Sequence, residues 1–189
     1  RYALTSQRVA GDPTKLPGPI GVRASKRVEV MRDGAGVVAE IEPGVAFSYL
    51  TFGGQVPGPM IRVRQGDTVH LTLTNPSTNR DVHNVDLHAV YGPGGGAESM
   101  MVVPGQSASI EFKVLYPGAF IYHCAVPALD FHISSGMYGM ILVEPEEGLP
   151  PVDHELYFGQ NEIYLKGAAG AHGLREFDYD AMRAEDPTY

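Results

Sequence analysis

Short segments in which apolar residues alternate with polar ones follow one another along the middle of the chain. Between residues 69 and 74 every second residue is apolar, as in a β-strand with one buried face, and His70 falls on the outward face. Comparable short runs cover residues 45–52, 60–63, 110–114, 120–124 and 137–143. Turn-forming pairs separate them at Gly66-Asp67, Pro104-Gly105 and Pro117-Gly118. This spacing predicts an all-β chain folded as a sandwich or barrel.

The two ends of the chain have a different texture from this central part. Residues 1–26 are rich in glycine and proline without a sustained period, so we expect an extended N-terminal arm. The alternating runs lie within a predicted domain of residues 27–147. Residues 148–189 are expected to form a C-terminal linker segment, with one strand at 156–165 and a short helix at 177–183. The glycine-rich run 92–96 predicts a flexible surface loop, because no Gly-Lys-Ser/Thr follows it.

Composition agrees with many short strands and narrows the choice of partners. Hydrophobic residues make up 43% of the chain and charged residues 19%, which is typical of a globular domain rather than a disordered one. The 189 residues carry a net charge of −8, which argues against nucleic acid or an anionic membrane as the main partner. A single cysteine, Cys124, excludes a disulfide within the chain.

Side chains that bind metals are concentrated in one stretch of the sequence. The sequence HNVDLHA at 83–89 supplies two histidines, YHC at 122–124 adds a histidine and the cysteine, and the last members are His132 and Met137. Two imidazoles, one thiolate and a weak thioether form the ligand set of a blue-copper site, whereas zinc seldom takes a thioether. The sequence therefore predicts a copper site.

Strand parity divides these residues into two groups. Neighbouring residues of a strand point to opposite faces, so Cys124 lies on the apolar side and His123 on the other. If His83 joins Cys124 inside, then His88 and Asp86 share the outward face with His123. This predicts two sites, joined by the peptide bond between His123 and Cys124.

These motifs resemble a known family. HNVDLHA, the glycine-rich loop after it, YHC and the spacing Cys-x7-His-x4-Met resemble the first cupredoxin domain of copper-containing nitrite reductases, especially the class that includes the outer-membrane enzyme of Neisseria. The similarity extends from about residue 45 into the tail. It implies a cupredoxin-type Greek-key β-sandwich.

The resemblance also assigns roles to individual residues. It implies a type 1 copper, which receives electrons, held by His83, Cys124, His132 and Met137. His88 and His123 would supply two of the three ligands of a type 2 copper that binds nitrite. Asp86 would hydrogen-bond the nitrite and relay protons. The implied reaction converts nitrite, one electron and two protons into nitric oxide and water.

Partners and location follow from the same resemblance. It implies a homotrimer with the type 2 site between subunits, a small blue-copper protein or c-type cytochrome as electron donor, and a periplasmic or outer-membrane-associated location. Family members carry a second cupredoxin domain that contributes the third type 2 histidine, and this chain contains no such domain. We therefore expect the chain to be a fragment of a longer protein; the alternatives are that the remainder is a separate chain or that the domain has been repurposed.

Two other functions are compatible with parts of the sequence. A single blue-copper electron carrier would explain His83, Cys124, His132 and Met137 but not the shared face of the remaining residues. A small laccase-like multicopper oxidase would need paired His-x-His motifs, whereas this chain has His-x4-His. His154 and His172 lie in the polar tail and are expected to be surface residues.

Overall fold

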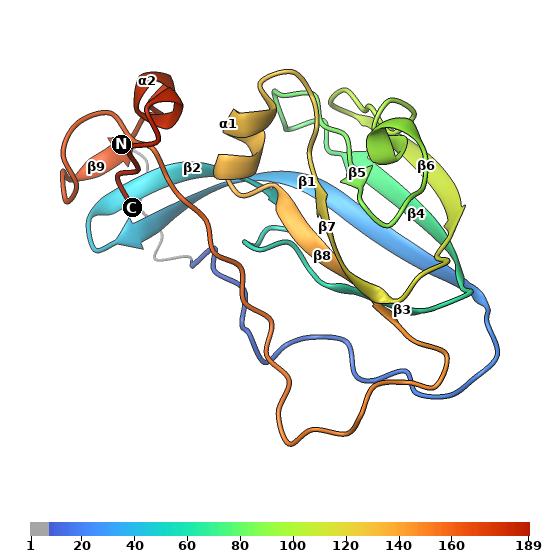
Figure 1. Cartoon of the computed structure of the whole chain (residues 1–189). Coiled ribbons are helices and arrows are strands. Elements are labelled where there is room, and N and C mark those ends of the chain that lie inside the picture. Colours follow the sequence, from blue (N-terminus) through green and yellow to red (C-terminus); the bar gives the residue numbers. More distant parts are fainter. Residues whose placement is uncertain (1–7) are drawn as a thin grey trace.

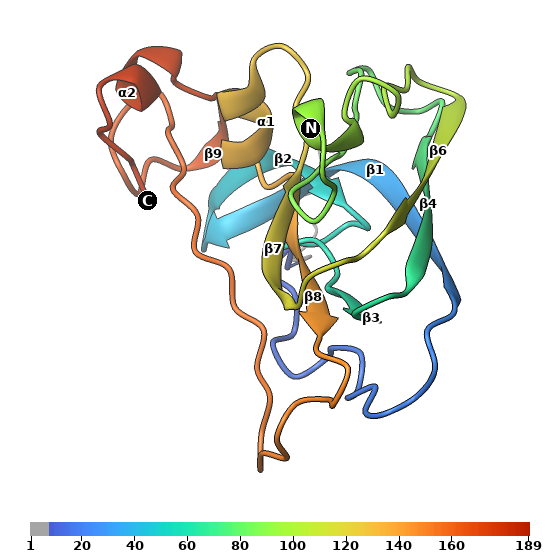
Figure 2. The ribbon, with the colours of Figure 1, turned by 45° about the vertical axis from the view of Figure 1, so that its right-hand side comes forward.

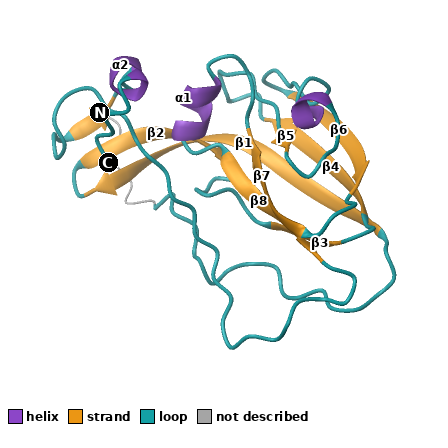
Figure 3. Ribbon diagram, in the orientation of Figure 1, coloured by secondary structure: helices purple, strands orange, loops and turns teal. Residues whose placement is uncertain are grey.

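The computed structural model describes residues 8–189 as two facing β-sheets with little helix (Figures 1 and 3). The predicted all-β class is confirmed. The strands are β1 (Arg27–Glu42), β2 (Val45–Phe52), β3 (Ile61–Arg64), β4 (Thr68–Asn75), β5 (Asp86–Leu87), β6 (Gln106–Lys113), β7 (Gly118–His123), β8 (Tyr138–Glu144) and β9 (Gly173–Arg175). The described residues also form three short helices, namely η1 (Pro93–Gly96) and α1 (Leu129–Ser134) between strands and α2 (Tyr179–Arg183) after β9.

The strands form a five-stranded and a four-stranded sheet. The first has the order β6-β4-β1-β2-β9 and the second the order β3-β8-β7-β5. In Figure 2, β7 and β8 of the four-stranded sheet lie opposite β4 and β6 of the five-stranded sheet. In β4 the apolar residues Val69, Leu71 and Leu73 are fully buried between the sheets, and the residues between them are half-exposed. The alternation in the sequence thus places this strand with its apolar face toward the core.

The longest strand, β1, was not predicted from the sequence. It pairs in parallel with β4 along its first half and antiparallel with β2 along its second half. Gly34 and Gly36 interrupt its alternating pattern in the middle. Gly34 meets a packing need there, because a Cβ on it would lie 3.0 Å from Cδ2 of the His83 ring. The close approach of this imidazole explains why a strand contains glycine, a residue that weakens strands, at position 34.

The arm and the C-terminal segment are fastened to the sandwich through a buried ion cluster. Residues 1–7 of the predicted arm lie outside the described residues, and residues 8–26 contain no strand beyond one bridging residue. Arg62 is buried and donates to Glu144, to Glu155 of the C-terminal segment and to the Pro17 carbonyl oxygen of the arm. Figure 1 shows both segments running along one side of the sheets. The predicted domain boundaries stay predictions.

The prediction of a strand at 156–165 is wrong. These residues form no regular strand, and only Leu165 makes an isolated bridge, to Phe177. Ile163, Tyr164 and Leu165 are buried in a second apolar cluster with Phe47 and Tyr49 of β2. These residues are thus apolar because they pack the C-terminal segment against β2, not because they pair in a sheet.

The short helix predicted at 177–183 is confirmed as α2. Its N-terminus is capped by Asp178, whose carboxylate accepts from the backbone N–H groups of Asp180 and Ala181. The tail also supplies β9, which was not predicted and which pairs in parallel with the start of β2. None of the helices in residues 8–189 has the length and apolar character needed to cross a membrane.

Candidate metal centres

A buried cluster forms where three separate segments meet at one end of the sandwich. His83 lies before β5, Cys124 follows β7 directly, and His132 lies in α1. One ligand atom from each of the three lies within 4.8 Å of the others. Cys124 Sγ is 3.4 Å from His132 Nδ1, and the buried His83 Nδ1 has no hydrogen-bond partner. A buried polar atom without a partner is costly, so the orphaned nitrogen suits an ion held between these groups.

Met137 closes the same region through its backbone. Its side chain is fully buried in the main core. The Cys124 N–H donates to the Met137 carbonyl oxygen at 3.0 Å, and the Met137 N–H donates to the His132 carbonyl oxygen at 3.0 Å. Main-chain hydrogen bonds therefore connect all three predicted ligands of the Cys-x7-His-x4-Met motif. These bonds hold the segment from Cys124 to Met137 in a defined conformation.

Asn84 is a buried residue of this site that the sequence analysis missed. Its side-chain oxygen accepts from the Ala125 N–H at 2.6 Å, and its side-chain nitrogen donates to the Ala97 carbonyl oxygen at 3.2 Å. It thus connects the His83 segment to the residue after Cys124. A polar residue directly beside a predicted ligand was the only signal in the sequence that could have identified it.

Burial sets the protonation states in this cluster. Burial, with a smaller contribution from nearby His132, lowers the pKa of His83 to about 4, and burial also lowers the pKa of His132. Both imidazoles are therefore neutral near pH 7, the form that binds metals. Burial raises the pKa of the Cys124 thiol, while backbone N–H groups of Asn84, Val126 and Ala125 act in the opposite direction. A metal cation bound at Sγ would displace the thiol proton and stabilise the negative charge of the thiolate.

A second cluster lies on the outward side of the four-stranded sheet. One ligand atom from each of Asp86, His88 and His123 lies within 4.8 Å of the others. The Nε2 atoms of His88 and His123 are 3.1 Å apart. Asp86 and His123 are partners in the β5–β7 register, and the His88 N–H donates to the Ile121 carbonyl oxygen at 3.0 Å. Sheet pairing therefore holds the two imidazoles and the carboxylate together.

The two clusters have opposite exposure, as the parity argument predicts. Cys124 and His83 are almost completely buried, at 0% and 1% exposure. His123 is partly buried and His88 is exposed. The structure thus brings His83, Cys124 and His132 together in one group and Asp86, His88 and His123 in the other. Met137 is connected to the first group by backbone hydrogen bonds, and the roles of all these residues as ligands stay predictions.

The remaining histidines lie outside both clusters. His70 points outward from β4, and its Nδ1 is 2.8 Å from a carboxylate oxygen of Glu29. His154 and His172 are exposed. The predicted flexible loop at 92–96 is not free along its length, because Gly95 is buried against Asp86 and Leu87.

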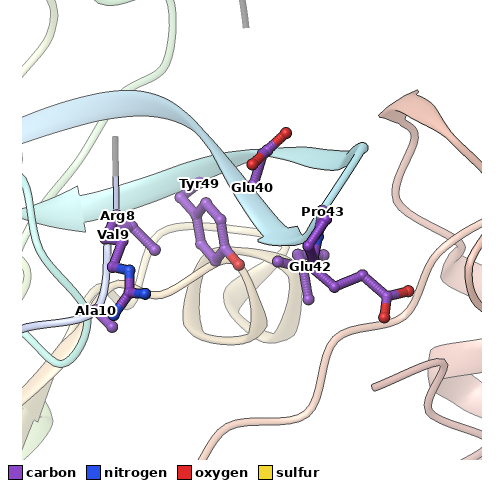
Figure 4. Close-up of a pocket in the computed structure, with 8 residues that line it drawn as sticks. Arg8, Val9, Ala10, Glu40, Glu42, Pro43 and Tyr49 are labelled. Carbon is purple, nitrogen blue, oxygen red and sulfur yellow. The ribbon is translucent and has the colours of Figure 1, made fainter. Parts of the chain in front are cut away.

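A hollow beside the end of β1 does not coincide with either cluster. It has a volume of about 500 Å³ and is lined by Arg8, Val9, Ala10, Glu40, Ile41, Glu42, Pro43 and Tyr49, most of which Figure 4 labels. Burial raises the pKa of Tyr49 to about 12, so its hydroxyl is neutral. The candidate metal centres among the described residues are therefore the two clusters, whose ligand atoms lie within 4.8 Å of one another.

Comparison with known proteins decides the family. The family model for multicopper oxidases matches residues 27–148. The chain belongs to the multicopper oxidase family. It is 49% identical to the copper-containing nitrite reductase of Neisseria meningitidis serogroup B over 93% of its own length, and 42% identical to that of Rhizobium sullae over 65%. The predicted resemblance to copper-containing nitrite reductases is confirmed.

Solved structures agree on the fold of this multicopper oxidase family member. The copper nitrite reductase of Nitrosomonas europaea matches with a TM-score of 0.68 at 28% identity, over 85% of this chain and 54% of the other. A multicopper oxidase crystal structure matches with a TM-score of 0.65 at 30% identity, over 82% of this chain and 57% of the other. The predicted cupredoxin-type Greek-key sandwich is confirmed. The chain spans less than half the length of the curated relatives, covering 45% of the Neisseria protein and 34% of the Rhizobium protein.

The buried cluster fits the metal that the multicopper oxidase family implies. A soft sulfur and two neutral imidazoles in one dry pocket favour copper over hard cations, which prefer oxygen ligands. The unpartnered Nδ1 of His83 supplies the donor atom that such an ion would engage.

Proposed function

We propose that this chain is the copper-binding domain of an enzyme that reduces nitrite to nitric oxide. One observation carries the proposal, namely that a buried His-Cys-His cluster and an outward His-His-Asp cluster share the His123–Cys124 peptide bond. An electron carrier with one copper has no use for the second cluster. The identity of the curated relatives supports the same reaction.

The buried cluster would hold a type 1 copper and the outward cluster a type 2 copper. In this proposal the type 1 ligands are His83, Cys124, His132 and Met137. His88 and His123 supply two type 2 ligands. Copper, when bound, would supply a centre that cycles between two oxidation states one electron apart. Met137 and the burial around Cys124 would tune the potential, because the axial ligand and the dry surroundings of the sulfur control it.

The protein's own groups would handle the electron and the protons. An electron received at the buried cluster would reach the outward one along the bonds of Cys124 and His123, which is the shortest covalent path between them. Asp86 would hydrogen-bond nitrite beside the two imidazoles and pass protons to it. Nitrite, one electron and two protons would give nitric oxide and water. One N–O bond breaks, and its oxygen takes both protons and leaves as water.

The outward cluster needs a further ligand in this proposal. Two imidazoles do not complete a copper shell, and His154 and His172 lie in neither cluster. The third ligand would be a histidine outside this chain, donated by a neighbouring subunit of a homotrimer. The electron donor would be a small blue-copper protein or a c-type cytochrome, in the periplasm or at the outer membrane.

A nitrite assay on the full natural protein tests this function. Copper-loaded protein, an electron donor and nitrite should yield nitric oxide, measured with a selective electrode. His88→Ala should abolish nitric oxide formation while the buried cluster still accepts one electron. His70→Ala, which removes an outward histidine of β4, should leave both nitric oxide formation and electron uptake unchanged. Undiminished nitric oxide formation by His88→Ala would overturn the proposal. Electron uptake without nitric oxide formation by the unaltered protein would instead favour the electron carrier.

A further inference from the structure

The glycine-rich turn of η1 lies directly against Asp86. Gly95 is buried and has a φ of +49°, in the left-handed region that favours glycine. A Cβ atom on Gly95 would lie 2.1 Å from Asp86 Oδ1. It would also lie 2.8 Å from the Leu87 nitrogen and 2.9 Å from the Leu87 carbonyl oxygen. No side chain fits at this position while the Asp86 carboxylate keeps its place.

The backbone on both sides of this contact is held more firmly than the carboxylate. Leu87 is fully buried, and β5 pairs it with Tyr122 of β7. The turn is closed by a hydrogen bond of 2.7 Å from the Ala97 N–H to the Gly94 carbonyl oxygen. The Ala97 carbonyl oxygen in turn accepts from the buried Asn84 side chain. The end of the Asp86 side chain can therefore turn away from an added Cβ, whereas relief of the two Leu87 contacts needs a small shift of the backbone.

We propose that Gly95 is a positioning residue that holds the Asp86 carboxylate beside His88 and His123. Gly95 touches neither imidazole and acts only through Asp86, so its role in turnover rests on the proposed function of Asp86. The turn thereby serves as a steric stop for the carboxylate. Position 95 must lack a side chain, because a side chain there would push the Asp86 carboxylate out of the site.

Gly94 provides a matched control in the same turn. Its φ of +63° is also left-handed, but a Cβ on Gly94 would meet no heavy atom within 4 Å. Gly94→Ala and Gly95→Ala therefore impose a similar backbone penalty. They differ in the contacts of the added Cβ, which in Gly95→Ala meets both Asp86 Oδ1 and the Leu87 backbone. Removing the Asp86 carboxylate in each variant separates the Asp86 contact from the Leu87 contacts.

Crystal structures of the two variants of the copper-loaded chain test the positioning directly. In Gly95→Ala the Asp86 carboxylate should leave its position beside His88 and His123, with the buried cluster unchanged and only a small backbone shift where the added Cβ meets Leu87. In Gly94→Ala it should stay. An Asp86 carboxylate that keeps its place in Gly95→Ala, because the turn moves instead, overturns the proposal.

Thermal unfolding keeps the proposal testable if Gly95→Ala folds poorly. Gly95→Ala should unfold at a lower temperature than Gly94→Ala. Adding Asp86→Ala removes the atom at 2.1 Å and should recover part of the loss for Gly95→Ala, but nothing for Gly94→Ala. Equal effects of Asp86→Ala on both variants would contradict a contact specific to Gly95.

Turnover of the full natural protein separates this inference from the proposed function. Gly95→Ala should lower nitrite reduction about as far as Asp86→Asn, on the order of 10²–10⁴-fold, and the double variant should lose little more. If Asp86→Asn keeps full activity, the proposed role of Asp86 fails even where the carboxylate moves. If Asp86→Asn loses activity but a displaced carboxylate in Gly95→Ala does not, the positioning role fails alone.

Discussion

His123 and Cys124 are consecutive residues, yet their side chains belong to different clusters on opposite sides of the four-stranded sheet. Cys124 is fully buried with His83 and His132, whereas His123 lies with its Nε2 3.1 Å from the Nε2 of exposed His88. Alternation along β7 produces this arrangement, because neighbouring strand residues face opposite ways. One peptide bond thus joins a dry site with a sulfur donor to an open site without one.

The proposed role of Met137 as a copper ligand leads to the first prediction. Met137→Leu keeps an apolar side chain of similar volume in the core but removes the thioether. The copper-loaded chain should stay coloured, because the thiolate bond remains, while its reduction potential shifts. Redox titration followed by visible absorption measures both quantities. An unchanged potential would exclude Met137 as an axial ligand.

Asp86 should contribute to turnover rather than to folding. In the full natural protein Asp86→Asn should keep both coppers and the unfolding temperature, and lower nitrite reduction by about 10²–10⁴-fold, the usual contribution of a proton-transferring group. Steady-state rates over a range of pH and metal analysis check this. A variant with wild-type rates at every pH and lower stability would mean that Asp86 only supports the turn.

Asp67 should make the stability of the chain depend on acidic pH. Burial alone would raise the pKa of Asp67, but hydrogen bonds from Arg23 and from the backbone N–H groups of Arg64 and Lys26 outweigh it and leave the pKa lowered. A lowered pKa stabilises the fold above the unfolded value of about 3.9, and this stability is lost as pH falls through the folded value.

Asp67→Asn should therefore lower the free energy of unfolding by about 1.5–3 kcal/mol near pH 7, the contribution of hydrogen bonds to a charged group. The difference from the unaltered chain should shrink below about pH 4. Denaturant unfolding at several pH values measures it. Asp153→Asn, at an exposed carboxylate, serves as the control. A difference that stays constant down to pH 2 would contradict the proposed linkage.

Sequence patterns predicted the parts of the molecule where local periodicity and burial agree. The strand at 45–52 coincides with β2, and parity alone separated Cys124 from His123. The same argument failed for β1, since Gly34 and Gly36 break its alternation, and Gly34 is required by the close approach of the His83 ring. It also failed at 156–165, where apolar residues of the C-terminal segment pack against β2 without forming a strand.

The supporting residues of the site were beyond the reach of sequence patterns. Asn84 and Gly95 matter through contacts with Ala125, Ala97 and Asp86, which lie close only after the sheets have formed. A glycine-rich run by itself is typical of a mobile loop, and nothing in its spacing indicates which carboxylate it will touch. Tertiary packing decides these roles.

A copper titration of this chain, followed by visible absorption and electron paramagnetic resonance, tests the two-cluster account most directly. The first equivalent of Cu(II) should bind tightly at His83, Cys124 and His132 and give an intense thiolate charge-transfer band, which Cys124→Ala abolishes. A second equivalent should bind weakly, without such a band, and be lost in His88→Ala while the first remains. A colourless first equivalent in the chain with Cys124 intact, or a band that survives Cys124→Ala, would contradict the account.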